Sequence, residues 1–278
     1  MKNISFGQYY PAESIIHKLD PRTKVILAVL YIVCSFVCKN ILSFVALVIL
    51  GVFTVLMSKI PLKTVLRSIK PLIVIMVFMS LLNLFMTQGG VLIAEFWVFK
   101  LTSKGIYAAV TAIIRVIALV VGTSIFLTYT TTPIALTDGI EQLLNPLKKI
   151  KVPVHEFAMM MTLALRFIPT LIEETDKIIA AQKARGADFT SGNLLKRAKA
   201  LIPILVPLFI SAFRRADELA VAMECRCYRG GEGRTKLHTL RYQAKDFVFI
   251  IGFVTFLVGL ILVNHLGIEV PFVGENWF

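Results

Sequence analysis

The sequence has few charged residues, and acidic ones are especially scarce. Only 17% of its 278 residues are charged, 17 Asp and Glu stand against 30 Lys and Arg, and 57% are hydrophobic. The mean hydropathy of +0.78 is too high for an ordinary soluble domain. A net charge of +13 would suggest nucleic-acid binding in a soluble protein, but in a membrane protein the distribution of the basic residues matters more. We therefore expect an integral membrane protein that binds no nucleic acid.

Cysteine is scarce as well, with four residues in the chain. Cys34 and Cys38 lie one helical turn apart in an apolar run, and Cys225 and Cys227 lie in a basic segment. This spacing predicts no disulfide framework and fits a reducing compartment. Cys225 and Cys227 could bind a soft metal, but the chain has no matching second pair. We expect small helix-end residues there and no metal site.

Several catalytic motifs are missing. The chain has no GxxxxGK[ST] phosphate-binding loop, and the glycines and lysine of 231–236 have the wrong spacing, which favours a polar turn. His155-Glu156 begins like a zinc-protease helix, but Met159 stands where the second ligand would be. The carboxylates near the apolar runs form no acid–base pair. We therefore expect no enzyme, no catalytic residue and no directly bound cofactor.

Five apolar runs predict membrane-spanning helices, at 23–38, 41–57, 71–87, 105–127 and 247–266. An odd number of spans places the termini on opposite sides. Of the 30 Lys and Arg, 26 fall in segments 1–24, 59–70 and 131–246, which would share one side. The positive-inside rule makes that side cytoplasmic. The sequence predicts a multi-pass protein of the cell membrane, with a cytoplasmic N-terminus and no cleaved signal.

The runs divide the chain into three regions. Residues 1–130 form a membrane region with four spans, 131–246 a cytoplasmic or interfacial region with two long helices, and 247–278 the last span and a tail. Within the middle region, the apolar runs 157–165 and 200–213 are too short to cross a bilayer. The predicted fold class is an all-α integral membrane protein with about five transmembrane helices plus long cytoplasmic helices.

The middle region carries an internal repeat. Ala184-Arg185-Gly186 and Cys225-Arg226-Cys227 end two helical segments, and their arginines are 41 positions apart. The same offset relates two sets of residues that are spaced by four and three and so lie on one face of a helix. The first set is Ile168, Ile172, Thr175, Ile179 and Gln182, and the second is Phe209, Phe213, Ala216, Ala220 and Met223. The repeat predicts a duplicated helix with a mostly apolar stripe and an arginine at its C-terminal end.

The arginines allow two interpretations each. Arg185 and Arg226 could stabilise helix C-termini through the helix dipole, with Gly186 as an ordinary residue after the cap. The duplication instead favours two equivalent docking points, because an arginine fork suits carboxylates on a partner. Arg115, inside a predicted span, could line a substrate or ion path or be bonded within the helix bundle.

Several segments resemble, in order, the transmembrane (T) component of energy-coupling factor transporters over nearly the whole chain. They are Gly7-Gln8-Tyr9-Tyr10-Pro11, Ser14-Ile15-Ile16-His17-Lys18-Leu19-Asp20-Pro21-Arg22-Thr23-Lys24, Leu165-Arg166-Phe167-Ile168-Pro169-Thr170, Ala184-Arg185-Gly186-Ala187-Asp188 and Arg214-Arg215-Ala216-Asp217-Glu218. Paired Ala-Arg-Gly motifs are that family's signature. The first motif matches fully. In the second, cysteines replace the alanine and the glycine, and Arg226 is kept.

The resemblance implies the membrane scaffold of an ABC-type importer of vitamins or metals in a bacterium. Its implied partners are two cytoplasmic ATPases, which use the ATP, and a small membrane protein, the S component, which binds the substrate. The implied ATPase-docking residues are Ala184, Arg185, Gly186, Cys225, Arg226 and Cys227. The implied S-component contacts are Phe157, Met160, Met161, Leu165, Leu205, Leu208, Phe209 and Phe213. The long helices of 131–246 would be coupling helices that transmit movement between these partners.

Two other functions compete with this one. A self-sufficient carrier or channel would use Arg115 and Asn83 to line its path, and it would transport without ATPases. The sparse charge within the spans and the long segment 131–246 count against it. A membrane enzyme is disfavoured because no catalytic constellation is present.

Overall fold

The chain folds into two compact units in the computed structural model, which describes residues 9–87, 89, 92–96, 99–187, 189, 193–230 and 239–265. The first, here called the bundle unit, comprises Met1–Leu143 and Leu240–Phe278. The second, here called the two-helix unit, is Leu144–Thr239. The sequence-based boundary at residue 131 differs from this one because a short helix, Pro133–Leu143, belongs to the bundle unit.

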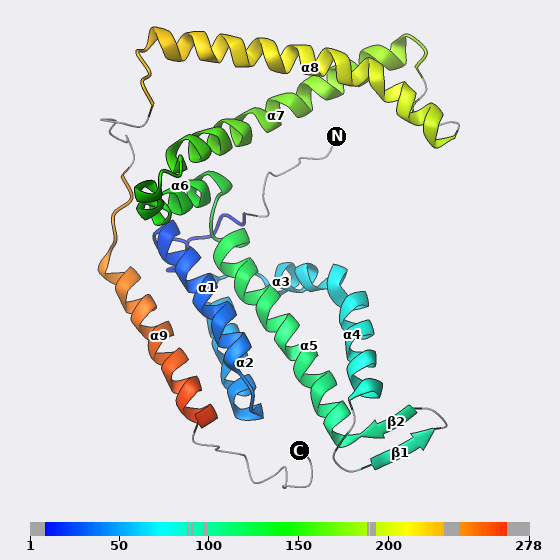
Figure 1. Cartoon of the computed structure of the whole chain (residues 1–278), viewed down its shortest axis with the longest axis vertical. Coiled ribbons are helices and arrows are strands. Elements are labelled where there is room, and N and C mark those ends of the chain that lie inside the picture. The colour runs from blue at the N-terminus through cyan, green and yellow to red at the C-terminus, as the bar shows by residue number, and fades with distance from the viewer. Residues whose placement is uncertain are drawn as a thin grey trace. The chain divides into compact units, whose positions relative to one another are not determined.

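The described residues are predominantly helical, as predicted (Figure 1). In the bundle unit the helices are α1 (Pro21–Val37), α2 (Ile41–Ser58), α3 (Leu62–Ile69), α4 (Ile73–Met86), α5 (Ser103–Thr123), α6 (Pro133–Leu143) and α9 (Ala244–His265). A 3₁₀ turn, η1 (Lys70–Leu72), joins α3 to α4, and a π-helical turn, η2 (Ser124–Tyr129), extends α5. The two-helix unit holds a 3₁₀ turn, η3 (Asn145–Ile150), and the helices α7 (Val154–Ala184) and α8 (Leu194–Cys225).

Local sequence signals start the bundle helices. Asp20 caps α1, because its side chain accepts a hydrogen bond from the backbone N–H of Arg22 at 3.0 Å, and Pro21 supplies a preset φ at the first helical position. Thr102 caps α5 in the same way through the N–H of Gly105, at 3.2 Å. These two apolar runs therefore begin as helices where the sequence offers both a cap and a hydrophobic continuation.

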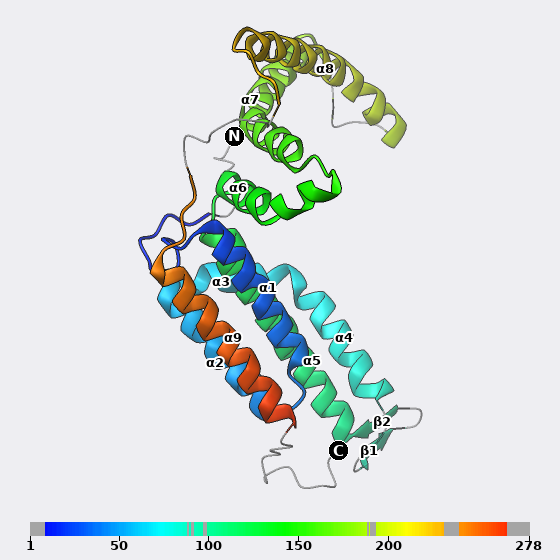
Figure 2. The same cartoon turned by 60° about the vertical axis from the view of Figure 1, so that its left-hand side comes forward.

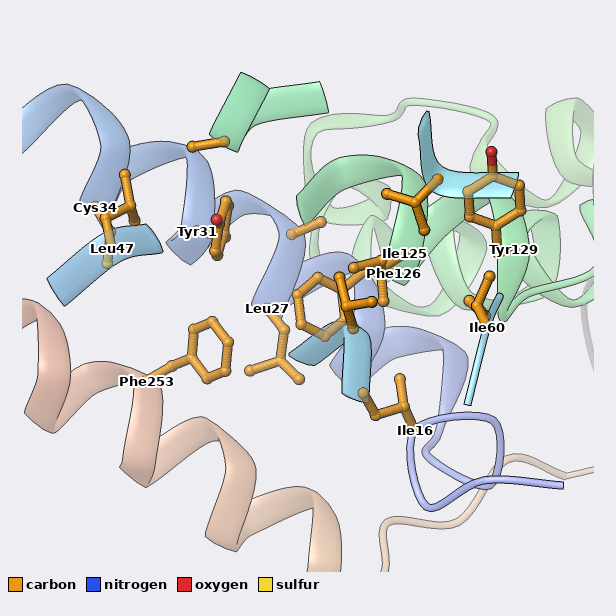
Figure 3. Packing of buried hydrophobic residues seen from close by; sticks show 14 of the residues in the cluster. Ile16, Leu27, Tyr31, Cys34, Leu47, Ile60, Ile125, Phe126, Tyr129 and Phe253 are labelled. Carbon is orange, nitrogen blue, oxygen red and sulfur yellow. The ribbon is translucent and has the colours of Figure 1, made fainter. Parts of the chain in front are cut away.

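The bundle packs around α1 and α5. Helix α1 contacts α5, α6 and α9, while α5 also contacts α2 and α4 (Figures 1 and 2). Their buried apolar side chains form one cluster, in which the rings of Phe126 and Phe253 meet edge to face with centroids 5.7 Å apart (Figure 3). Tyr31 and Leu27 of α1 are fully buried in the same cluster. This packing joins η2, at the end of α5, to α9 across more than 100 residues of chain.

Four helical segments of the described chain are long and apolar enough to cross a membrane: Ile41–Ser58, Leu62–Met86, Ser103–Tyr129 and Ala244–His265. Together with the exposed apolar surface of these helices, this agrees with the predicted all-α membrane fold. The remaining predicted span corresponds to α1, whose 17 residues reach about 25 Å. Among the described bundle helices, α1 and α2 are the most enclosed, with seven buried residues each.

In the basic segment 59–70, residues 62–69 form α3, which leads through η1 into the third predicted span. The chain changes direction between α3 and α4 (Figure 1), at the 3₁₀ turn that contains Pro71. Proline removes a backbone donor and clashes with the preceding helical turn, which explains a bend there. The predicted span begins at Pro71, and in the structure a separate amphipathic helix, α3, precedes it.

A two-stranded antiparallel ribbon was not anticipated from the sequence. Strand β1 (Leu92–Phe96) pairs with β2 (Phe99–Thr102), with Glu95 opposite Lys100 and Phe96 opposite Phe99. Such a ribbon is too short to alter the fold class, and it connects α4 to α5.

A buried polar cluster ties α9 to the beginning of α1. The carboxylate of Asp246, 1% exposed, accepts hydrogen bonds from the backbone N–H groups of Asp20 at 2.9 Å and Gln243 at 2.7 Å. Lys24 is also buried, and its ammonium donates to the carbonyl of Thr130 at 2.7 Å. Buried charges remain stable only when they are bonded in this way. The cluster therefore fixes three distant parts of the chain at one end of the bundle.

The lead-in before α1 is ordered by its contacts with η2 and with itself. The N–H of Tyr10 donates to the carbonyl of Tyr129 at 3.0 Å. The ring of His17 donates from Nε2 to the carbonyl of Tyr10 at 3.0 Å, so Nδ1 of the neutral ring accepts from the Ser14 hydroxyl at 2.7 Å. Burial lowers the pKa of His17, which favours this neutral form. Residues 7 and 8 of the lead-in motif lie outside the described residues.

Replacement of Gly122 by Ala should destabilise the bundle. A Cβ at Gly122 would lie 2.2 Å from Cε1 of Tyr31, whose side chain is fully buried. Overpacking of this kind costs about 1–3 kcal/mol. We expect a lower midpoint of thermal unfolding for the detergent-purified chain. Gly252→Ala on α9 is the matched control, because nothing lies within 4 Å of a Cβ there. Equal midpoints for the two variants would contradict the packing of Tyr31 against α5.

Candidate functional site

The two-helix unit consists mainly of the long helices that the repeat predicts. Helices α7 and α8 have 31 and 32 residues and pack against each other. The short apolar runs of the sequence are thus parts of much longer helices. Pro169 lies inside α7, and Pro203 and Pro207 lie inside α8. Helix α8 changes direction along its length (Figure 1), which the two internal prolines explain.

An ion pair joins α7 and α8. The Glu174 carboxylate accepts a hydrogen bond from Nη2 of Arg215 at 2.6 Å and a second from the hydroxyl of Ser211. Both charged side chains are partly buried, 32% exposed for Arg215 and 22% for Glu174. A further contact runs from Nε2 of Gln182 to the carbonyl of Pro203, at 3.5 Å. A charge-assisted hydrogen bond between half-buried groups holds the two helices in register.

Glu174 and Arg215 are 41 positions apart, the offset of the repeat. They therefore occupy equivalent positions in the two copies of the duplicated helix, each 11 residues before its terminal arginine. When two equivalent residues touch, they lie near the approximate twofold axis that relates the two copies. Helices α7 and α8 therefore cross at about the same position within each copy of the repeat. The sequence prediction did not include this pair, although the offset of 41 alone places two opposite charges at matching positions.

Helix α7 ends in a Schellman motif. The N–H of Gly186 donates to the carbonyl of Lys183 at 3.0 Å, and the N–H of Ala187 donates to that of Gln182 at 3.0 Å. Gly186 has a φ of +84°, the left-handed conformation that this motif requires after the cap. Arg185 is the cap residue itself. The last residue of this sequence motif, Asp188, lies outside the described residues.

Helix α8 ends with the same geometry, although its sequence differs. The N–H of Cys227 donates to the carbonyl of Glu224 at 2.8 Å, and the N–H of Tyr228 donates to that of Met223 at 3.0 Å. Cys227 takes the left-handed conformation with a φ of +55°, at a cost of roughly 1–2 kcal/mol relative to glycine. The replacement of glycine by cysteine therefore leaves the backbone at Arg226 unchanged. Sequence pattern alone could not establish this.

The two cap arginines are exposed. Within the described part of the chain, neither Arg185 nor Arg226 is within ion-pair distance of a carboxylate. The end of α7 leads into the start of α8, so the two motifs lie at opposite ends of α8 (Figures 1 and 2). The unit thus presents two guanidinium groups at two separate points, both exposed and without an ion-pair partner among the described residues.

The helices also present a large apolar surface. Of the eight predicted S-component contacts, the structure exposes six (Phe157, Met160, Met161, Leu205, Phe209 and Phe213) and leaves Leu165 and Leu208 half-buried. Leu171 of α7 and a run of α8 residues line a hollow of about 470 Å³ in this surface. An exposed apolar area of this extent marks a contact with a protein or a membrane.

The two polar side chains that a carrier would use both bond backbone carbonyls of the bundle unit. Nη2 of Arg115 donates to the carbonyl of Cys38 at 3.1 Å, and its guanidinium lies over the ring of Phe44, 5.3 Å from the centroid. The side-chain amide of Asn83 donates to the carbonyl of Met79 in its own helix, at 3.0 Å. These contacts favour a structural role for Arg115. Its guanidinium binds the carbonyl of Cys38, the residue that caps the end of α1.

The cysteines take part in no metal site among the residues that the structure describes. All four are free, and Cys225 and Cys227 are exposed at the end of α8. In the same residues, no three His, Cys, Asp or Glu side chains gather as metal ligands would. The predicted turn at 231–236 lies outside the described residues.

Comparison with known proteins agrees with this architecture. The family model CbiQ, described as cobalt transport protein, matches residues 12–237. The chain is 53% identical to the energy-coupling factor transporter transmembrane protein EcfT of Ruminiclostridium cellulolyticum, over 96% of this chain and 99% of the relative. It is 51% identical to that of Thermosediminibacter oceani (94% and 98%) and 47% identical to that of Bacillus subtilis (91% and 96%). The chain therefore belongs to the CbiQ family, among the transmembrane (T) components of energy-coupling factor transporters.

Proposed function

We propose that this protein is the scaffold that couples two cytoplasmic ATPases to a substrate-binding S component, for uptake of a vitamin or a metal. The observation that carries the proposal is the pair of helix ends with the same backbone geometry, at which Arg185 and Arg226 stand exposed and unpaired in the described part of the chain. Each arginine would enter an acidic groove of one ATPase, with Ala184, Gly186, Cys225 and Cys227 shaping the surrounding backbone.

The helix caps argue against a purely local role for these arginines. The Schellman hydrogen bonds already satisfy carbonyls at the end of α7 and of α8 without the guanidinium groups. What remains for a capping role is the dipole effect, about 0.3–1 kcal/mol for an exposed cation. A guanidinium group that binds a partner carboxylate through two hydrogen bonds contributes more free energy than this dipole effect. Such binding explains why both copies of the repeat carry an arginine.

Transmission would pass along α7 and α8. The Glu174–Arg215 ion pair joins the helices near their crossing, so a displacement at one helix end is carried to the other helix. The exposed apolar residues Phe157, Phe209 and Phe213 belong to the same two helices and would bear on the S component. ATP binding would close the ATPases, move the two arginine ends and reorient the S component.

The remaining parts of the proposal concern chemistry and place. The ATPases would use the ATP, and this chain would bind no cofactor and catalyse no reaction itself. It would lie in the cell membrane of a bacterium with its N-terminus in the cytoplasm, as the distribution of its Lys and Arg favours. The internal bonding of Arg115 and Asn83 counts against a self-sufficient carrier or channel.

Copurification tests the scaffold function. We expect the tagged chain, extracted in mild detergent from its own cells, to bring down two ATPase chains and one small hydrophobic protein. Reconstitution of that complex should give ATP-dependent uptake of the small protein's ligand. A chain that purifies alone and, reconstituted alone, moves a solute would contradict the proposal and establish the carrier.

A further inference from the structure

A wholly apolar groove opens on the bundle unit between α2, α3 and α5. Its volume is about 440 Å³, within the range of roughly 300–1,000 Å³ typical of ligand sites. Aliphatic side chains from all three helices line it, with Val52 of α2 and Ile117 of α5 among them, and the fully buried Tyr31 contributes its ring. The groove lies among helices long and apolar enough to cross a membrane.

Helix α3 forms one wall of this groove and has two distinct faces. Leu62, Val65, Leu66 and Ile69, at steps of three and four, line the groove. Lys63, Arg67 and Lys70 follow the same spacing on the adjoining face and are exposed, as is Lys59 just before the helix. Such a division into an apolar and a basic face is typical of helices that lie at a membrane surface.

The position of α3 is fixed by contacts with the end of α5. The hydroxyl of Tyr129 in η2 donates to the carbonyl of Thr64 at 3.1 Å and also bonds the hydroxyl of Ser68. Val65 is buried against the bundle. The basic face is therefore held at the rim of the groove. Within the described residues, none of its cations lies within ion-pair distance of a carboxylate.

We propose that this groove binds one anionic phospholipid, with an acyl chain among the aliphatic side chains and the headgroup phosphate on Lys63 and Arg67. The charge of the rim complements the headgroup, because basic residues beside a membrane segment attract anionic lipids. The lining complements the chain, since it offers an acyl tail apolar contact and no polar group to desolvate. The proposal requires only that the chain lies in a membrane and is independent of the ATPase and S-component partners.

A lipid fits the lining better than a partner helix does. Helices that pack together in membranes meet at small residues and exchange hydrogen bonds through Ser, Thr or Asn side chains. In this groove the only small residues are Gly51 and Ala118, both buried, and the exposed lining is Val and Leu. The basic face of α3, whose cations have no ion-pair partner among the described residues, also matches a phosphate more closely than it matches an apolar helix.

Native mass spectrometry of the full chain, titrated with phosphatidylglycerol or with phosphatidylcholine, tests the site. We expect one phosphatidylglycerol to bind in preference to phosphatidylcholine. Lys63→Gln with Arg67→Gln should remove this preference, at roughly fivefold in affinity for each cation. Val52→Trp, at an exposed position that lines the groove, should weaken both lipids because the indole occupies the space of the acyl chain. Val48→Phe serves the same purpose if Val52→Trp lowers the folded yield.

Matched variants control for charge and for bulk. Lys148→Gln with Lys149→Gln removes two exposed cations elsewhere, and Val74→Trp adds an indole at an exposed site on α4 that does not line the groove. Both should bind lipid like the unchanged protein. The site would be overturned if the cation variant loses its preference for phosphatidylglycerol while Val52→Trp binds both lipids as strongly as the unchanged protein. That result would mean that the cations attract lipid headgroups without any acyl chain in the groove. Val52→Trp that keeps the lipid but releases a copurifying membrane protein would assign the groove to that protein instead.

Discussion

Reversal of both cap arginines, Arg185→Glu with Arg226→Glu, is expected to release both ATPases from the complex and leave the chain in the membrane. Loss of one member of a hydrogen-bonded interfacial charge pair costs about 2–5 kcal/mol, which is at least roughly a 30-fold loss of affinity. Reversal adds repulsion from the acidic groove. Both side chains are exposed and unpaired in the described part of the chain, so the folded chain loses little. Copurification of tagged ATPase with the variant measures the effect.

A single reversal separates docking from a general charge effect. Arg226→Glu alone should weaken ATPase retention less than the double variant, because two linked contacts act together. Arg166→Glu with Arg214→Glu is the matched control, since both arginines are exposed on the same two helices. Full retention of the ATPases by the Arg185, Arg226 double variant, or an equal loss in the control, would reduce the two arginines to helix caps.

The sequence predicted the helical membrane fold and the long helices because both follow from periodicity. Apolar runs of 16 to 23 residues and a stripe repeated at an offset of 41 are properties of the chain itself. The ribbon of β1 and β2 escaped prediction because its strands have five and four residues, too few for a clear alternation. Helix α3 was not predicted as a separate element, because the segment 59–70 was distinguished from the spans only by its basic residues.

The candidate site was predicted only in part, for a physical reason. The motifs at Arg185 and Arg226 are local, so their helix-end positions could be inferred from the chain. The left-handed backbone at Cys227 could not, because cysteine rarely takes that conformation and nothing in the sequence says that it does here. The Glu174–Arg215 contact depends on how two helices cross, which propensity and pattern do not specify.

Exchange of the two charges at the helix crossing should restore what either single reversal destroys. Glu174→Arg alone places two guanidinium groups at one contact and deprives Ser211 of its acceptor. A hydrogen bond to a charged group contributes about 1.5–3 kcal/mol, so we expect at least a tenfold loss of ATP-dependent uptake by the reconstituted complex. Because the positions are equivalent in the repeat, Glu174→Arg with Arg215→Glu recreates the pair with its direction reversed, and uptake should recover.

The neighbouring positions supply a control of the same form. Glu173 and Arg214 are also 41 positions apart, and both are exposed. Glu173→Arg alone and Glu173→Arg with Arg214→Glu should therefore leave uptake near the level of the unchanged protein. The midpoint of thermal unfolding, measured on all variants, distinguishes a weakened crossing from a general loss of folding. If the Glu174, Arg215 exchange is no better than the single reversal while the chain stays folded, coupling does not pass through this pair, and the apolar contacts of α7 with α8 must carry the movement instead.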